Sequence, residues 1–282
     1  MKAASRESSV LVLTTGRYVL GAMMLAALFA ARGHPMPAAE AWRFHAGRGI
    51  AVTTAALSFF WAVSQLPLVV ATVLGFTAVL MVAPLGWIVL GERPSRASLA
   101  ASVVGLLGAG LAASGAAGGG NAEAAGAPVL GAVAAILAAL AYALALVLLR
   151  LRTRSEPPLT ILLLANVVPA AILTLLCAGL AVLPPGLAMP EARALLPVLP
   201  LALLGIGVWW LMTLAYAAAP AFRLAPLEYV ALPVSAALGA LLFGEAPGWR
   251  LYAGAAVIVG ACLFVVSEER LRARRPVSTV AG

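Results

Sequence analysis

Long apolar stretches separated by short polar ones run through almost the whole chain. Between Arg48 and Glu92 no residue is ionisable, and the only interruption is the short group Gln65, Leu66 and Pro67. A helix needs about 20 apolar residues to cross a bilayer, so this stretch alone predicts two crossings. The same criterion predicts nine transmembrane helices along the chain, at residues 9–30, 49–64, 67–91, 97–116, 128–149, 159–181, 194–216, 225–244 and 248–267.

Composition strengthens this interpretation. The 282 residues are 63% hydrophobic and 10% charged, with a mean hydropathy of +1.06. Such a chain has too little polar surface to cover a water-soluble globule. The first apolar segment is not a cleaved signal peptide, because Arg17 interrupts it and no clean small-residue cleavage site follows. We therefore predict an all-α polytopic membrane protein.

Positive charge is distributed unequally between the two sides of the membrane. Alternate loops on one side hold most of the arginines, including those of the basic tail at residues 268–282. The positive-inside rule then predicts a cytoplasmic C-terminus and, with nine crossings, an external N-terminus. A basic tail after a last transmembrane helix is typical of contact with anionic lipid, so we expect no nucleic-acid partner.

Little in the sequence indicates enzymatic or metal chemistry. Aspartate is absent, and Cys177 and Cys262 fall inside predicted helices with no second cysteine nearby. His34 and His45 fall in the loop after the first predicted helix, where we expect them to be solvated. Paired carboxylates, a histidine beside a nucleophile and a metal-ligand set are not visible. We expect neither an enzyme nor a bound metal or cofactor.

One sequence pattern occurs twice, as LGWIVLGERP from Leu85 and as LGALLFGEAP from Leu238. The first four predicted helices correspond to the last four, whereas the helix at 128–149 has no counterpart. An odd number of helices separates the two copies, which turns one upside down relative to the other. We predict two inverted repeats, of four helices at 9–116 and five at 128–267, joined by a Gly/Ala-rich linker at 117–127.

The paired motif has a structural explanation. Glycine ends a helix, proline prevents its continuation, and glutamate caps a helix or pairs with a nearby arginine. Inversion places Glu92 on the cytoplasmic side and Glu245 outside. We expect the motifs to shape gates rather than to hold substrate, through Gly91, Glu92, Pro94, Gly244, Glu245 and Pro247.

Polar and aromatic residues within the spans are better guides to a substrate path. Trp209 and Trp210 fall near the middle of the seventh predicted helix, whereas tryptophans that anchor a helix prefer its ends. Thr213 and Tyr216 share a helix face with Trp209. Either this face lines a cavity or its rings fill space between helices. The remaining candidates for a substrate cavity are Ser58, Trp61 and Asn166.

Two charged residues are candidates for coupling or recognition. Arg17 lies about two turns into the first segment, where exposure to lipid costs at least about 2.5 kcal/mol. If another helix precedes the chain, Arg17 moves toward a loop. Glu228, in LAPLEYVALP, either couples transport to protons or recognises an amine, or is a first-turn glutamate favoured by the helix dipole.

The chain resembles the EamA type of the drug/metabolite transporter superfamily. The resemblance rests on both LGxxxxGExP copies, on GRYVLGAMMLAALFAARG, and on the segments LPLVVATVLGFTAVL and LAYAAAPAFRLAPLEYVALP. Members carry two five-helix repeats of opposite orientation, so the family's first helix is missing here. Either the true start lies upstream or this is a nine-helix variant.

The resemblance implies a bacterial inner-membrane transporter that works by alternating access on a small organic solute. It favours export of amino acids or related metabolites. Efflux of lipophilic cations and a non-transporting accessory role are the alternatives. The sequence does not disclose the substrate, the coupling ion or the oligomeric state.

Overall fold

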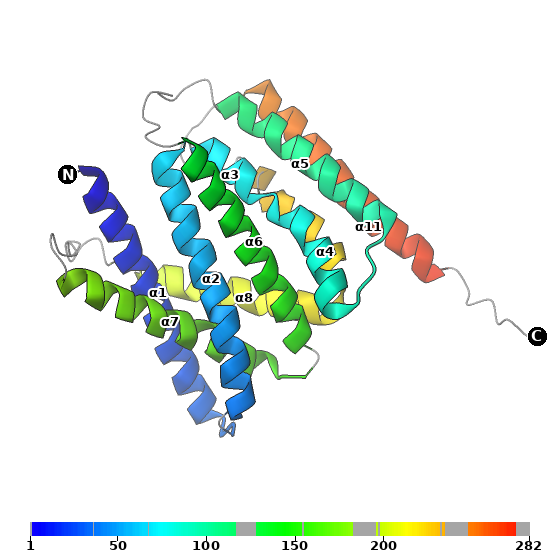
Figure 1. Cartoon of the computed structure of the whole chain (residues 1–282). Coiled ribbons are helices and arrows are strands. Elements are labelled where there is room, and N and C mark those ends of the chain that lie inside the picture. Colours follow the sequence, from blue (N-terminus) through cyan, green and yellow to red (C-terminus); the bar gives the residue numbers. More distant parts are fainter. Residues whose placement is uncertain are drawn as a thin grey trace, which may run out of the picture. The chain divides into compact units, whose positions relative to one another are not determined.

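The structure, a computed structural model, describes residues 2–35, 37–66, 68–116, 128–153, 155–182, 196, 198–231, 233–234 and 248–274. Every regular element in these ranges is a helix (Figure 1). The elements are α1 (Lys2–Ala31), α2 (Ala39–Gln65), α3 (Leu68–Gly75), α4 (Ala78–Leu90), α5 (Arg96–Ala116), α6 (Pro128–Arg152), α7 (Pro158–Val182), α8 (Val198–Ala218), α9 (Ala221–Leu224), the 3₁₀ helix η4 (Ala225–Val230) and α11 (Trp249–Arg274).

Most of these helices have the length and apolarity of membrane spans. Six qualify on both counts within the described residues. They are Leu11–Ala31, Ala39–Gln65, Ala71–Leu90, Val129–Arg152, Pro158–Leu180 and Val198–Ala218. Two shorter apolar helices, Arg96–Leu111 and Tyr252–Phe264, fall in further predicted segments. The chain is thus an all-α polytopic membrane protein, as predicted.

Five predicted segments differ from the observed helices. The first helix, α1, begins at Lys2 rather than at residue 9, and the last, α11, ends at Arg274 rather than at residue 267. The second helix begins at Ala39 rather than at residue 49, because its charged first turns also fold as helix. The third is divided into α3 and α4 at Phe76 and Thr77, where the Thr77 hydroxyl donates to the Leu74 carbonyl. The eighth, predicted at 225–244, is preceded by α9 and begins as the 3₁₀ helix η4, and residues 235–247 lie outside the described part.

The helices form two compact units. Unit 1 comprises Met1–Phe60 and Leu144–Ala219, and unit 2 comprises Trp61–Ala143 and Pro220–Gly282. Each unit therefore takes helices from both predicted repeats, an arrangement that the sequence analysis did not foresee. We call two helices or residues counterparts when they hold the same position in the two repeats.

Unit 1 brings together the counterparts α1 and α7. The Thr15 hydroxyl lies 3.3 Å from the Cys177 sulfur. Further along α1, a Cβ on Gly21 would lie 2.7 Å from the Asn166 side-chain oxygen. A position later in α1 thus meets one earlier in α7, so the two helices run antiparallel. Between these two contacts, Tyr18 packs into a buried cluster with side chains of α7.

Unit 2 brings together the counterparts α5 and α11, which lie side by side in Figure 1. Ala101 packs against Ala261, and a Cβ on Gly108 would lie 3.1 Å from the Gly254 carbonyl. These two contacts also require antiparallel helices. Because α5 follows the first Gly-Glu motif and α11 the second, the beginnings of these helices lie at opposite ends of the pair. This is the arrangement that inverted repeats require.

The break between α3 and α4 meets η4 within unit 2. Phe76 lies in the break and Tyr229 lies in η4, with ring centres 5.4 Å apart. The Tyr229 hydroxyl lies 3.3 Å from the Phe76 carbonyl and 3.1 Å from that of Ser102. Phe76 and Tyr229 are 153 residues apart, the same interval that separates Leu85 from Leu238. They are therefore counterparts in direct contact.

Candidate functional site

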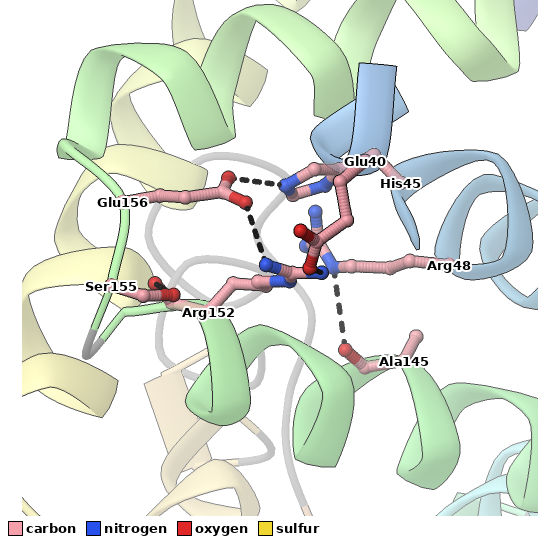
Figure 2. A network of polar contacts seen from close by, with 7 residues as sticks. All are labelled: Glu40, His45, Arg48, Ala145, Arg152, Ser155 and Glu156. Carbon is pink, nitrogen blue, oxygen red and sulfur yellow. Dashed lines mark hydrogen bonds and ion pairs between the residues drawn. The ribbon is translucent and has the colours of Figure 1, made fainter. Parts of the chain in front are cut away.

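A cluster of charged side chains joins the polar ends of three helices of unit 1 (Figure 2). His45 projects from the first turns of α2, and its Nε2 lies 2.8 Å from Oε2 of Glu156 in the α6–α7 loop. Arg152 ends α6 and forms two ion pairs: its Nη1 lies 3.3 Å from Oε1 of Glu156, and its Nη2 lies 3.3 Å from Oε1 of Glu40. The His45 side chain is fully buried, whereas that of Glu40 is 85% exposed. One end of the cluster is therefore the buried pair of His45 and Glu156, and the other end is the ion pair of Arg152 with the exposed Glu40.

Two buried arginines lie close to this cluster. Arg48 is 2% exposed, and its Nε donates to the Ala145 carbonyl at 3.4 Å. Its guanidinium carbon lies 5.1 Å from the ring centre of Trp209. Arg150 is 7% exposed and donates to the Tyr216 carbonyl in α8. Tyr216 lies in the last turn of α8, where a cation that donates to a carbonyl also opposes the negative end of the helix dipole, so the Arg150 contact stabilises this helix end.

A cavity of about 280 Å³ lies beside the charged cluster. Its wall combines the end of α1, the start of α2 and the α6–α7 loop, with Glu40, Arg152 and Glu156 among the lining side chains. Three buried atoms of the cluster, His45 Nδ1, Arg152 Nε and Glu156 Oε1, have no hydrogen-bond partner among the described residues, although Glu156 Oε1 lies 3.3 Å from Arg152 Nη1 in an ion pair. A cavity of this size with charged side chains on part of its wall has room for water or a small solute.

Two of the sequence candidates, Arg17 and Asn166, lie inside the helical spans of unit 1. The Arg17 guanidinium carbon lies 4.0 Å from the Tyr18 ring centre, and its Nη1 lies against Gly205 of α8. Asn166 is 3% exposed and donates to the Leu162 carbonyl at 2.9 Å. Both polar groups thus lie where α1, α7 and α8 meet.

The candidates of α8 differ in their surroundings. Trp209 packs against a buried cluster of side chains from α1 and α7. Thr213 is 1% exposed and donates back to the Trp209 carbonyl at 2.7 Å, and Tyr216 is 1% exposed. The face that these three share is therefore turned into unit 1. Trp210 is 36% exposed. Trp209 also lies under the Arg48 guanidinium, and the cavity role of this face stays a prediction.

The remaining candidates are dispersed. Ser58 is half-buried in α2, whereas Trp61 belongs to unit 2 and is 45% exposed. Glu228 lies in η4, half-buried, immediately before Tyr229. Within the part of the chain that the structure covers, no group of three or more His, Cys, Asp or Glu side chains could hold a metal.

The first Gly-Glu motif joins two elements of unit 2. Gly91 has φ 67° and ends α4, with its amide donating to the Trp87 carbonyl at 3.0 Å. The Glu92 carboxylate accepts a hydrogen bond from the Ala221 amide, at the start of α9, at 3.1 Å. Pro94 lies in the loop that follows α4. The counterparts Gly244, Glu245 and Pro247 lie outside the described residues.

One expectation about the histidines was wrong. His45 is helical and buried rather than a solvated loop residue, because the helix that carries it begins at Ala39. Sequence reasoning therefore missed the charged cluster as a whole. A usable signal was present: Arg152 and Glu156 have the i,i+4 spacing of an ion pair, and the polar stretch before residue 49 contains no proline after Pro37.

A comparison with protein-family models assigns the chain. The model of the EamA-like transporter family matches residues 1–114 and 129–267. The chain belongs to the EamA-like transporter family. A solved crystal structure superposes with a TM-score of 0.75 at 24% identity, covering 91% of this chain and 88% of the other, which supports the same fold.

Two curated proteins similar to this EamA-like chain are each named riboflavin transporter. The protein from Rhizobium johnstonii is 36% identical over 141 residues, which are 50% of this chain and 45% of that protein. The protein from Vibrio cholerae serotype O1 is 38% identical over 80 residues, 27% of each chain. The chain thus matches about half the length of the first relative and less of the second.

Proposed function

We propose that this EamA-like chain transports riboflavin, or a planar heteroaromatic solute of similar chemistry, across a membrane by alternating access. The observation that carries the proposal is the similarity to two proteins named riboflavin transporter, at 36% and 38% identity. The family assignment supports transport, and the inverted counterparts in each unit support a fold that can open to either side.

The composition of the two units bears on how the chain would move. Counterpart helices are packed together inside each unit, α1 with α7 and α5 with α11. Moving one repeat against the other would break both of these interfaces, whereas moving unit 1 against unit 2 would preserve them. Alternating access in this chain would therefore keep α1 packed on α7 and α5 packed on α11.

Flux into proteoliposomes tests the proposal. Purified full-length protein is reconstituted, and riboflavin is followed by its fluorescence with the solute supplied outside or loaded inside, so that uptake and export are separated. Liposomes without protein are the control. We expect saturable riboflavin flux that unlabelled riboflavin competes away. A flux no larger than that of the control liposomes overturns the proposal.

The same vesicles test the expectations from the sequence. Export of amino acids and efflux of lipophilic cations stay predictions, and labelled tryptophan and a lipophilic dye serve as their probes. Flux of tryptophan without flux of riboflavin would favour amino acid export. A chain that moves no solute would favour the accessory role. Fusions to the C-terminus in a bacterial host test the expected inner-membrane location and the cytoplasmic tail.

A further inference from the structure

Arg17 is a cation held inside the membrane-spanning part of unit 1. It belongs to the span Leu11–Ala31 and lies next to Tyr18, which packs into a buried cluster with Ala170 and Leu173 near the middle of α7. Arg17 thus lies within α1, fifteen residues after its first residue, Lys2. A charge at this depth is costly unless it faces protein, water or a solute.

The guanidinium of Arg17 points deeper into the span. A Cβ on Gly16 would lie 3.4 Å from the side chain of Val198, the first residue of α8. Nη1 of Arg17, the next residue of α1, instead lies against Gly205 of α8. Seven residues of helix separate Val198 from Gly205, which is about 10 Å. Helical side chains lean toward the N-terminus of their own helix, which for Arg17 is the nearer end of the span. The Arg17 side chain therefore points toward the C-terminal end of α1, away from the nearer end of the span, where a long charged side chain would reach water soonest.

No carboxylate explains this orientation. Among the residues that the structure describes, Arg17 makes no ion pair or hydrogen bond, and its one polar contact is with the Tyr18 ring. The ion pairs described in unit 1 involve Glu40 and Glu156, beside a cavity lined by Phe29 at the far end of α1. Twelve residues of helix, about 18 Å, separate Arg17 from Phe29. The donors of this guanidinium are accordingly available to a ligand.

The position of Gly205 fits the same conclusion. A Cβ at Gly205 would collide with Nη1 of Arg17, so the absent side chain is what gives the guanidinium its place. At Gly207, two residues further along the same helix, a Cβ would meet nothing within 4 Å. Of these two glycines of α8, therefore, only Gly205 leaves room for the Arg17 guanidinium.

We infer that Arg17 is a recognition residue for the transported solute. Its guanidinium would bind, in two-point fashion, a planar group with two neighbouring acceptor atoms. Arginine offers parallel N–H donors in a rigid plane, a geometry that lysine lacks. The dioxopyrimidine ring of a flavin, at N1 and the neighbouring C2 carbonyl oxygen, and the carboxylate of an amino acid share this acceptor chemistry. The inference rests on the proposed transport function, and it names the group of the solute that is bound.

Kinetics in proteoliposomes test the inference on the full-length protein. Arg17→Lys keeps the charge and removes the planar fork, and Arg17→Gln removes the charge. Loss of a charge-assisted, two-point hydrogen bond is expected to raise KM about tenfold or more, while the maximal flux changes less. Arg32→Gln, at the exposed end of the same helix, is the matched control and should leave KM unchanged.

A second pair of variants leaves the arginine in place. Gly205→Ala displaces the guanidinium and should raise KM, whereas Gly207→Ala should not. Running riboflavin and tryptophan side by side distinguishes the dioxopyrimidine from the carboxylate. Equal KM values for wild type, both Arg17 variants and Gly205→Ala overturn the inference while leaving the proposed function intact. A wild-type protein that moves neither solute overturns both.

Discussion

The contact between Gly105 and Tyr229 makes a quantitative prediction about the interior of unit 2. Tyr229 is fully buried, and its ring lies so close to Gly105 of α5 that a Cβ there would collide with it. The ring cannot simply turn aside, because its hydroxyl lies 3.3 Å from the Phe76 carbonyl and 3.1 Å from that of Ser102. Gly105→Ala must therefore either displace the ring or separate the helices.

The expected cost follows from three contributions. Overpacking a well-packed interior costs about 1–3 kcal/mol. Weakening the hydroxyl hydrogen bond adds about 1 kcal/mol. Replacing a helical glycine by alanine stabilises the helix by about 1 kcal/mol, which offsets part of this cost. Gly105→Ala should thus lower the free energy of unfolding by about 1–3 kcal/mol. Gly110→Ala, where a Cβ meets nothing within 4 Å, is the control and should raise it by about 1 kcal/mol.

Thermal unfolding of the purified protein in detergent measures the difference. A gap of about 2–4 kcal/mol between the two variants corresponds to melting temperatures that differ by about 4–8 °C. In a Tyr229→Leu background the ring is absent, so Gly105→Ala should cost at least about 1 kcal/mol less, which a double-mutant cycle reveals. If Gly105→Ala has the same melting temperature as Gly110→Ala when Tyr229 is present, the described contact is not present in the protein.

Three further predictions concern single glutamates. Glu156→Ala leaves the buried His45 without its partner and should lower the unfolding free energy by about 1–3 kcal/mol, and an unchanged melting temperature would contradict the described pair. Glu92→Ala removes the acceptor of the Ala221 amide and should cost about 1 kcal/mol. Hydrogen exchange at the start of α9 should then become faster, and unchanged protection there would count against the cap. Glu228→Gln should abolish solute accumulation driven by an imposed proton gradient while leaving exchange of solute down its own gradient, and accumulation equal to wild type would refute a coupling role.

The membrane spans could be predicted because burying apolar length in lipid leaves a direct signal in hydropathy. The same signal placed the start of the second helix at residue 49, although α2 begins at Ala39. Hydropathy reports whether a residue tolerates lipid and not whether it is helical. The charges before residue 49 are accommodated by partners from α6 and the following loop, such as Glu156 with His45. Those partners are distant in sequence, so a local reading could not supply them.

The candidate residues show a similar limit. Helical periodicity placed Trp209, Thr213 and Tyr216 on one face, and the structure turns that face into unit 1. Periodicity says which side chains share a face, but it says nothing about what lies opposite. The break at Phe76 escaped prediction for a related reason. Its sequence is continuously apolar, and the interruption of the helix is accompanied by the contact with Tyr229 of the other repeat.

The contact between Phe76 and Tyr229 also bears on how deep in the membrane Glu228 lies. Two residues related by a two-fold axis can touch only if both lie close to the axis, so Phe76 and Tyr229, with rings 5.4 Å apart, each lie within half that distance of it. In inverted repeats the axis lies in the plane of the membrane, near its middle. If the two repeats are related by such an axis, we expect Glu228, which immediately precedes Tyr229 in η4, to lie near the centre of the bilayer rather than at its surface. An acidic residue at that depth is costly, which makes it a candidate for exchanging protons with both sides of the membrane. This placement is the reason to test Glu228 for coupling.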